Sequence, residues 1–483
     1  MNPTFDTDFL RMLKKLNGRG IYLWQEDGKL KYKCKKGEMS ESILNKLKEV
    51  KQEFVEFLQY CENNMFQLSS LQSAYLIGGD NKCELGNISA HYYVEYEAKN
   101  INTEKLEKIL NELIKRHDAL RMVILPEGKN LILNNLPQYE LTTYSYSTTL
   151  ERDLVRNNWK NHDYPVGQWP MFHFEVGKSD ILDDVLHISF DCLILDAWSA
   201  QELIDEIFKL YRGETVSFPK QTFKEYMNKF REYQYLLEKQ ADDYWNQEIK
   251  NIVVPEIKTK IPIQHVTKPS FERIDYTFSL NETVTLYDNL RRIRLTPAAT
   301  ICTLFMKSLC DFFMIPGITL DITLYNRLPF YKEPQKILGE FTNIGLATLK
   351  KDGSIFFDEA IDVQRQFWKL LQYREYDGTK LLKKVGQGKS GKVYFPIVYT
   401  CMLTGNSEYK VQDSFREVYA LSKTPQVMLD HHVRDDLGYL KLSFDYVTDL
   451  FDEKDMIRLM DLYIKNIKEL ISLYTWKYYK PNK

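Results

Sequence analysis

The amino-acid sequence predicts a mixed α/β protein, in which a small N-terminal helix–hairpin–helix module precedes a larger body of two lobes. Its 483 residues are enough for about three compact units. Amphipathic helical segments alternate with short apolar strands along most of the chain. This alternation breaks in the stretch KNIVVPEIKTKIPIQ, residues 250–264, which indicates a boundary between lobes. We therefore expect domains at residues 1–62, 63–250 and 251–483.

The first 60 residues have the pattern of a self-contained module. Phe9, Leu13 and Leu16 recur at helical spacing, and Gly18 follows the end of that helix. The segment GIYLWQEDGKLKYKCKK is typical of a β-hairpin that turns at its Asp-Gly pair. Ser40 can cap a second helix. We expect that helix to be continuous along an apolar stripe of Ile43, Leu44, Leu47, Val50, Phe54, Phe57 and Leu58.

The second strand of the predicted hairpin carries a row of lysines. Alternation places Leu30, Tyr32 and Cys34 on one face of the strand. The opposite face carries Lys29, Lys31, Lys33 and Lys35. Lysines protect an edge strand against aggregation, and they also suit a strand that accepts an acidic partner peptide by β-augmentation. The spacing alone favours neither interpretation.

Two helices of the body follow from their periodicity. The segment NTEKLEKILNELIKRHDALRMVI, residues 102–124, predicts an amphipathic helix with a basic last turn, followed by a strand. The segment QELIDEIFKLY predicts another helix with Leu203, Ile207 and Leu210 on one face. Both helices can therefore bury one side against a sheet.

Two aspartates stand in the otherwise apolar segment HISFDCLILDAWS, residues 187–199. Alternation places Asp191 at the end of a strand, on the same face as His187. A strand-end carboxylate among apolar residues needs a partner. Asp196 directly precedes a helix, so the residues alone allow either an N-cap or a functional role. We expect His187 to be a core histidine rather than a base.

The pattern D-x-x-x-x-D-x-x-S, formed by Asp191, Asp196 and Ser199, resembles the signature of heterocyclization domains of nonribosomal peptide synthetases. Six further segments follow the order of that family: LSSLQSAYLIG (68–78), RHDALR (116–121), TLYNRLP (323–329), GEFTN (339–343), PIVYTCML (396–403) and TPQVMLD (424–430). The first 60 residues, with GIYLW, GKLKYK and the long second helix, resemble the tubulysin-type N-terminal docking domain of such synthetases.

These resemblances imply an architecture and a set of partners. The fold would be a V-shaped pseudo-dimer of two chloramphenicol-acetyltransferase-like lobes, with the active site in a tunnel between them. Upstream and downstream carrier (thiolation) domains would dock at opposite mouths and present substrates on their own phosphopantetheine. The docking domain would bind the C-terminal tail of an upstream synthetase subunit along the lysine strand. A homodimer through the docking domain is left open.

The implied reaction has two steps. An upstream carrier-bound acyl or aminoacyl thioester is condensed with carrier-bound Cys, Ser or Thr, and the product is cyclodehydrated to a thiazoline or oxazoline. The resemblance implies that Asp430, oriented by Thr400, is the acid/base of ring closure. By analogy with condensation relatives, Asp196 would pair with Arg327 between the lobes. Asp191 would face the tunnel and support condensation or local geometry.

Four positions depart from the family pattern. Gly79 stands where Arg is usual, Glu340 replaces the usual Asp of G-D-F-T, Cys401 stands where Ser is usual, and His432 replaces a common Gln. These departures concern substrate handling more than the reaction class.

Two segments only look like functional motifs. HHVRDDLG, residues 431–438, nearly spells the condensation signature H-H-x-x-x-D-G, but Leu437 stands where its Gly belongs. IGGDN, residues 77–81, has Asn81 in place of the Ser to which phosphopantetheine is attached in carrier proteins. The chain is therefore expected to act on carriers supplied from elsewhere.

Composition excludes several classes of protein. The net charge of -2 does not suggest nucleic acid or an anionic membrane surface as a partner. Seven scattered cysteines without a C-x-x-C pair indicate reduced thiols rather than a disulfide framework. There is no secretory signal, no membrane-spanning apolar run and no metal-ligand spacing. We expect a cytoplasmic enzyme that binds no metal or cofactor of its own.

Two other functions fit part of the pattern. An acyltransferase of the same fold could condense substrates without ring closure, but its mark would be the histidine-based signature. A non-catalytic platform could dock and order synthetase subunits, but the joint presence of Thr400, Asp430, Asp196 and Arg327 would then be unexplained.

Overall fold

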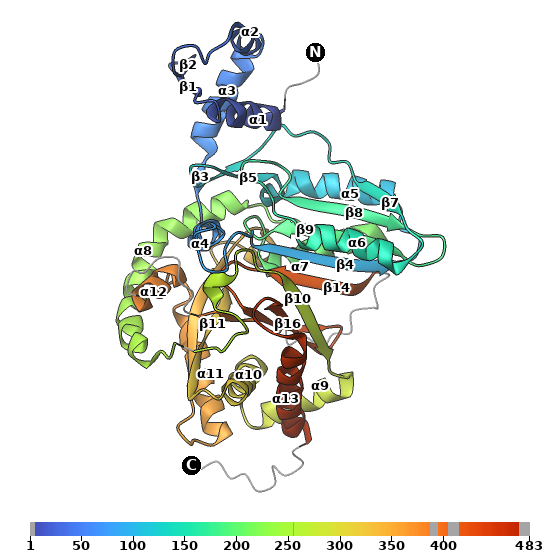
Figure 1. Cartoon of the computed structure of the whole chain (residues 1–483), viewed down its shortest axis with the longest axis vertical. Helices are drawn as coiled ribbons and strands as arrows, with labels where there is room; N and C mark the ends of the chain where they lie inside the picture. Colours follow the sequence, from blue (N-terminus) through green and yellow to red (C-terminus); the bar gives the residue numbers. More distant parts are fainter. Residues whose placement is uncertain (1–4, 255, 387–394, 404–414, 473–483) are drawn as a thin grey trace.

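The computed structural model describes residues 5–254, 256–386, 395–403 and 415–472. It consists of a small N-terminal module on top of two α/β lobes, each built around its own β-sheet (Figure 1). This agrees with the fold class predicted from the sequence.

The N-terminal module contains one more helix than expected. Its elements are α1 (Asp6–Asn17), β1 (Tyr22–Glu26), β2 (Lys29–Lys33), α2 (Glu41–Glu49) and α3 (Lys51–Asn64). The expected single helix after Ser40 is broken at Val50, whose φ of -111° and ψ of 15° are not helical. Beyond this break, Phe54 and Phe57 stack on Phe9 of α1 with centroids 5.1 and 5.2 Å apart. Aromatic packing between α1 and α3 thus outweighs the helical periodicity of the sequence.

The N-terminal module contacts the first lobe directly, and no long linker separates the two. Helix α3 runs to Asn64, and strand β3 begins at Phe66, so the expected boundary after residue 62 falls inside a helix. Asp6 Oδ2 accepts hydrogen bonds from two backbone N–H groups of the first lobe, at 2.9 and 3.0 Å. The Tyr60 hydroxyl donates to the carbonyl of Ile132 at 2.6 Å.

The first lobe is a mixed five-stranded sheet with helices around it. The sheet order is β14-β4-β9-β8-β7, where the strands are β4 (His91–Ala98), β7 (Thr142–Ser145), β8 (Phe172–Lys178), β9 (Asp184–Asp191) and β14 (Arg416–Lys423). A small sheet comprises β3 (Phe66–Gln67), β5 (Met122–Leu125) and β6 (Lys129–Ile132). The helices are α4 (Ser70–Gly78), α5 (Thr103–Arg116), α6 (Thr149–Lys160), α7 (Ala197–Arg212) and α8 (Phe223–Glu248).

The second lobe is built around a six-stranded sheet of order β10-β16-β15-β13-β11-β12. Its strands are β10 (Phe271–Thr277), β11 (Gly317–Tyr325), β12 (Thr342–Lys350), β13 (Ile397–Met402), β15 (Leu429–Asp436) and β16 (Tyr439–Val447). Its helices are α9 (Leu280–Arg292), α10 (Pro297–Phe313), α11 (Phe356–Gln372), α12 (Gly378–Val385) and α13 (Glu453–Ser472).

One face of the second sheet is apolar, and the other carries polar side chains. His431 of β15 packs among Phe305 of α10 and Tyr463 of α13, so odd-numbered positions of that strand face the helices. Asp430 and His432 therefore face the opposite way, because side chains alternate along a strand. The polar face formed by β11, β13, β15, β16 and β10 holds the candidate site.

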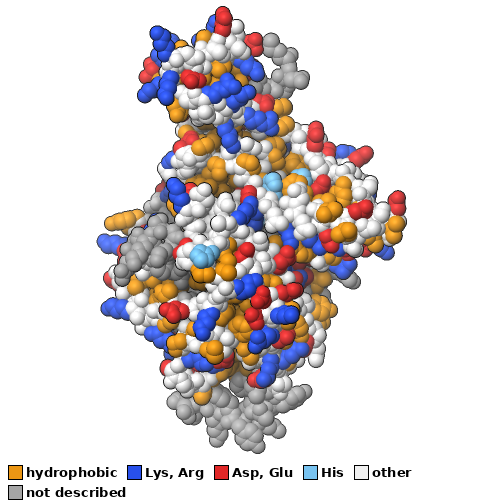
Figure 2. Space-filling model, viewed as in Figure 1, with side chains coloured by type: hydrophobic (Ala, Val, Ile, Leu, Met, Phe, Trp, Pro, Cys, Tyr) orange, Lys and Arg blue, Asp and Glu red, His pale blue; other side chains and the backbone are white. Residues whose placement is uncertain are grey.

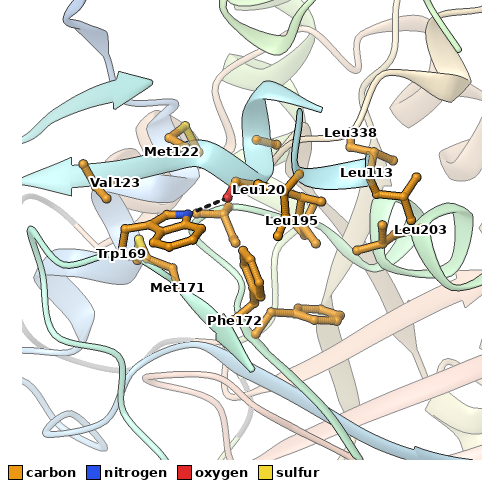
Figure 3. Packing of buried hydrophobic residues seen from close by; sticks show 14 of the residues in the cluster. Leu113, Leu120, Met122, Val123, Trp169, Met171, Phe172, Leu195, Leu203 and Leu338 are labelled. Atoms are coloured by element: carbon orange, nitrogen blue, oxygen red, sulfur yellow. Dashed lines mark hydrogen bonds between the residues drawn. The ribbon is translucent and has the colours of Figure 1, made fainter. Parts of the chain in front are cut away.

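The lobes exchange elements across the expected boundary at residue 250. Strand β14 comes from the C-terminal half of the chain but pairs with β4 in the first sheet. Leu338, also from the C-terminal half, packs with Leu113 and Leu203 in the core of the first lobe (Figure 3). The range 251–483 is therefore not a separate second lobe, because edge pairing and core burial draw parts of it into the first.

Candidate active site at the lobe junction

The loop after β9 is shaped by its two aspartates. Asp191 ends the strand, and its Oδ1 accepts a hydrogen bond from the backbone N–H of Leu193 at 2.8 Å. Asp196 is the N-cap of α7, with Oδ1 accepting from the Ser199 N–H at 2.7 Å. Each carboxylate satisfies a backbone donor that the turn leaves free.

Asp196 also forms a buried ion pair with Arg327, the pairing that the analogy with condensation relatives implied. Arg327 Nη1 lies 2.8 Å from Oδ2, and Nη2 lies 2.9 Å from Oδ1. Both side chains are almost completely buried. The guanidinium also lies over the ring of Phe341, 4.2 Å from its centroid. The two-point geometry fixes the TLYNRLP segment against α7 more reliably than it stabilises the fold.

Ser199 completes this junction. Its Oγ donates to the carbonyl of Gly339 at 2.8 Å and lies 2.7 Å from Arg327 Nη2. The N–H of Gly339 in turn donates to Ser199 Oγ at 2.9 Å. The spacing D-x-x-S thus places a carboxylate and a hydroxyl on the first turn of one helix, where both reach the same guanidinium.

Thr400 and Asp430 lie side by side on parallel strands of the second lobe. Thr400 Oγ1 donates to Asp430 Oδ1 at 3.3 Å, and Thr323 Oγ1 lies 2.8 Å from Thr400 Oγ1. Thr400 is 4% and Asp430 7% exposed, so this carboxyl is nearly shielded from bulk water. A carboxyl with one oxygen oriented by a hydroxyl and little water around it is suited to proton transfer.

His432 is a member of this site that sequence reasoning missed. Its Nε2 lies 3.3 Å from Asp430 Oδ2 and 3.2 Å from Asp445 Oδ2. Burial lowers the pKa of His432, but the two carboxylates outweigh burial and raise it to about 9. Two signals could have identified it: strand alternation from Asp430, and the departure from Gln at this position.

Burial raises the pKa of three further carboxyls near the junction. Burial raises the pKa of Asp191 to about 7 and that of Glu340 to about 8. Burial, and then the charge of Asp430, raise the pKa of Asp321 well above its usual range. Asp321 Oδ1 has no hydrogen-bond partner among the described residues, whereas Glu340 accepts from Ser69 Oγ at 2.6 Å. Burial, and then the nearby carboxyl groups of Asp191, Glu340, Asp430 and Asp196, raise the pKa of the Cys192 thiol.

The expected position of Asp191 facing the tunnel stays a prediction. Asp191 is 1% exposed, and its contact with Leu193 serves the local geometry of the turn. A direct catalytic role for it stays a prediction. His187, on the same strand face, is a core histidine as expected, with its ring nitrogens 2.6 and 2.8 Å from the hydroxyls of Tyr93 and Tyr144.

The lysine row lies on the outer face of the hairpin, but it is shorter than expected. Lys29, Lys31 and Lys33 are exposed and lie within β2, whereas Lys35 lies beyond the end of the strand. Register pairs Tyr22 with Lys33 and Trp24 with Lys31, so two exposed aromatic side chains share this face. Figure 2 shows basic and hydrophobic side chains next to one another on the module at the top of the view.

A small open pocket of about 70 Å³ lies where α4, α8 and β12 meet. Its lining includes Ser69, Tyr226, Asn326, Glu340 and Asp377, which come from both halves of the chain. Thr400 and Asp430 are not among the lining residues, so this pocket lies apart from the nearly buried Thr400–Asp430 pair.

Other classes of site find no support in the part of the chain that the structure describes. There, no group of three or more His, Cys, Asp or Glu side chains could hold a metal ion. None of the described helices is long and apolar enough to cross a membrane. All seven cysteines are free.

Comparison with known proteins shows two matching families. Residues 63–478 match the condensation domain, and residues 11–59 match the TubC N-terminal docking domain.

Two relatives illustrate the sequence similarity. Bacitracin synthase 1 of Bacillus licheniformis is 26% identical over 85% of this chain, and pyochelin synthetase PchF of Pseudomonas aeruginosa is 24% identical over 95%. The chain spans only 8% and 27% of the lengths of these two relatives. Among solved structures, the EpoB NRPS cyclization-docking bidomain from Sorangium cellulosum matches with a TM-score of 0.77 and 21% identity, covering 96% of this chain and 98% of that one.

Proposed function

The chain belongs to the condensation domain family, and from this premise we propose that it is a heterocyclization domain of a nonribosomal peptide synthetase. It would condense an upstream carrier-bound acyl thioester with carrier-bound cysteine, serine or threonine, and close the product to a thiazoline or oxazoline. The observation that carries this proposal is the nearly buried Thr400–Asp430 pair beside a junction built by Asp196 and Arg327. The likeness to the EpoB cyclization-docking bidomain supports it.

Condensation requires little chemistry from the protein. The amine nitrogen of the acceptor attacks the thioester carbon, the carbon–sulfur bond breaks, and the donor carrier leaves as a thiol. Because the thioester is already activated, the reaction needs no enzyme nucleophile. The protein contributes by holding two carriers with their reacting atoms close together.

Ring closure needs proton transfer, and Asp430 is the proposed group for it. The acceptor side-chain sulfur or oxygen attacks the new amide carbon, and its proton passes to the former carbonyl oxygen. That oxygen then leaves as water, taking the amide N–H proton with it and leaving a carbon–nitrogen double bond. Asp430 would relay both protons and end the cycle unchanged, while Thr400 holds one carboxyl oxygen. Such acid/base help is worth about 10²–10⁴-fold.

Mass measurement of the downstream carrier tests this proposal. Incubation of the chain with both loaded carriers should give the condensed product less one water, about 18 mass units lighter than the linear amide, as loss of water in ring closure requires. If only the linear amide accumulates with cysteine, serine and threonine acceptors, the protein is a condensation-only acyltransferase. If no amide forms although both carriers bind, it is a non-catalytic docking platform.

The N-terminal module supplies the proposed partner contact. Its family indicates interaction with an upstream synthetase subunit. We propose that the acidic and apolar C-terminal tail of that subunit lies along β2 (Lys29–Lys33). Backbone hydrogen bonds would supply affinity, the lysines would select negative charge, and Tyr22 and Trp24 would receive apolar side chains. Pairing of two copies of the chain through this module is likewise a proposal.

A further inference from the structure

A row of alternating charges crosses the polar face of the second lobe and ends at the proposed ring-closing carboxyl. Arg273 of β10 contacts Asp445 of β16 through two nitrogens at 2.6 and 2.5 Å. His432 Nε2 lies 3.2 Å from Asp445 and 3.3 Å from Asp430. The order is therefore guanidinium, carboxylate, imidazole, carboxylate, on neighbouring strands.

The far end of this row is rigidly anchored. Asp445 is fully buried, and its Oδ2 also accepts the backbone N–H of Ser422 at 2.9 Å. Ser422 belongs to β14, which pairs with the sheet of the first lobe. Both lobes thus hold Asp445 in place, and Asp445 in turn fixes where the His432 ring can lie.

The charge on His432 follows from its position between two carboxylates. Burial alone would lower its pKa, yet Asp430 and Asp445 raise it to about 9. At neutral pH the ring is an imidazolium with both nitrogens protonated. Without that proton, Asp445 would keep Arg273 as its partner, whereas Asp430 would lose its cationic neighbour.

The two oxygens of Asp430 have different partners. Thr400 donates to Oδ1, and His432 faces Oδ2. Thr400 contributes a hydrogen bond, whereas His432 Nε2 lies at ion-pair distance from Oδ2 without hydrogen-bond geometry. A cation beside one oxygen and a donor on the other favour one orientation of the carboxyl about its bond to Cβ. Proton transfer depends steeply on that orientation.

Other charged groups on this face have partners of their own. Arg434 and Lys441 both pair with Glu417 of β14, and Asp275 accepts from Ser443. His431 points to the opposite face. The charges that act on His432 are those of Asp430 and Asp445, and the charge of His432 acts on His431. Among the described residues, further ionisable groups on this polar face are Arg434 on the same strand, Lys441 on β16, Arg273 and Asp275 on β10, Glu417 on β14 and Tyr92 on β4.

We propose that His432 is a positioning residue for ring closure, holding the Asp430 carboxyl in the orientation that proton transfer requires. This inference rests on the proposed function. It goes beyond that function by naming a residue that acts through Asp430.

The test compares His432→Gln and His432→Ala with the wild-type chain, using His265→Gln at an exposed position as the matched control. Gln keeps an N–H donor near Nε2 but carries no charge. Ring closure and condensation are measured by mass on the downstream carrier from pH 7 to 10, and folding by circular dichroism. At each pH the rate of ring closure of the wild type is divided by that of the variant. Ionisation of the substrate thiol changes both rates equally and therefore drops out of this ratio. We expect His432→Gln to slow ring closure about 10- to 100-fold at pH 7 while condensation changes little.

The pH dependence separates positioning from mere structural support. The ratio should fall towards 1 as pH rises through about 9, because the wild type then loses the same charge. Nuclear magnetic resonance of the His432 ring gives a second readout, a titration midpoint that should drop in Asp430→Asn. A ratio that stays constant with pH, or ring closure at the wild-type rate in folded His432→Gln, would overturn the inference. If the wild type closes no ring, the proposed function is overturned instead. In that case the titration midpoint of the His432 ring still tests whether His432 is paired with Asp430.

Discussion

At the scale of single residues, this protein gives several polar side chains two tasks. Asp196 caps a helix and pairs with Arg327, and Ser199 accepts from that guanidinium while bonding Gly339 in both directions. The residues allowed a cap and the family resemblance implied an ion pair, and a carboxylate has enough lone pairs for both. Asp196 and Ser199 therefore connect the first turn of α7 to the junction between the lobes.

The Thr400–Asp430 pair should matter more for ring closure than for condensation. Asp430→Asn and Thr400→Val are expected to leave the linear amide on the downstream carrier, because acid/base help is needed mainly in the second step. The loss of ring closure should reach about 10²-fold or more. Asp436→Asn, at the exposed end of the same strand, is the control. An equal fall of both steps in folded variants would contradict this division of labour.

The Asp196–Arg327 pair should be needed for folding stability. Asp196→Ala would leave Arg327 buried without its carboxylate, at a cost of ~3–5 kcal/mol. Loss of the cap alone costs about 1 kcal/mol, which Asn102→Ala at the N-cap of α5 measures separately. The double change Asp196→Ala/Arg327→Met should recover part of the loss in urea unfolding. A wild-type free energy of unfolding in Asp196→Ala would show that the pair is dispensable.

Glu340 should make the fold less stable as pH rises. Its pKa is about 8 in the folded chain against an ordinary value of 4.5, so the native state holds a proton that the unfolded state releases in between. The free energy of unfolding should therefore fall from about pH 4.5 to about pH 8 by an amount on the order of 1 kcal/mol or more. Gln mimics the protonated acid, so Glu340→Gln should match wild type at pH 5 and melt higher at pH 8.5.

The control for this comparison is Glu232→Gln, at an exposed position of α8. Melting temperatures of the three proteins are read at both pH values. A difference between Glu340→Gln and wild type that does not grow with pH would show that the carboxyl is ionised throughout.

At the scale of elements, the N-terminal module contains one feature that follows the local sequence pattern, the hairpin, and one that departs from it, the interrupted helix. The hairpin forms at the predicted Asp-Gly turn, where both residues have positive φ. The helix, however, breaks at Val50, because stacking of Phe54 and Phe57 on Phe9 requires a change of direction. The outer face of the hairpin then combines lysines with two exposed aromatic rings.

Charge reversal on the hairpin should abolish docking of the upstream tail. In the full chain, Lys29→Glu/Lys31→Glu/Lys33→Glu should lose binding of an acidic C-terminal peptide in calorimetric titration, while ring closure persists at high carrier concentration. Wild-type binding should weaken as salt increases, because exposed charge pairs are screened.

The matched control reverses the same number of charges elsewhere in the module. Lys46→Glu/Lys48→Glu/Lys51→Glu alters exposed lysines of α2 and α3 and should leave the affinity nearly unchanged. Equal loss in both triple variants would indicate a general charge effect. Unchanged affinity in the hairpin variant would leave the lysine row with the role of edge protection.

At the scale of the whole molecule, the two lobes share strands and core residues. Strand β14 covers the edge of β4, and Leu338 lies in the core of the first lobe although it comes from the second half of the chain (Figure 3). Neither lobe can therefore unfold without exposing apolar surface of the other.

This interlocking predicts a single thermal transition for the lobes. Leu338→Ala should cost about 2–5 kcal/mol and lower the whole transition in scanning calorimetry, rather than splitting off a first-lobe component. Ile355→Ala, at a position 61% exposed, should leave the transition in place. Two resolved lobe transitions, of which Leu338→Ala moves only one, would show that the lobes unfold independently.

The sequence by itself determined the features that depend on neighbouring residues and on ordered motifs. Helical and strand periodicity, the Asp-Gly turn and the N-cap at Asp196 are local, so a single chain segment contains all the information. The seven ordered segments likewise indicated the two-lobed fold, the Asp196–Arg327 pair and the Thr400–Asp430 pair.

The tertiary structure alone decided what depends on distant segments. His432 is a neighbour of Asp445 because β15 and β16 pair in one register. Strand β14 joins the first sheet by pairing with β4, which lies more than 300 residues earlier in the chain. The burial that raises the pKa of Glu340 likewise arises from packing between segments far apart in the chain. Contacts of this kind follow from the free energy of the whole packed chain, which no local pattern encodes.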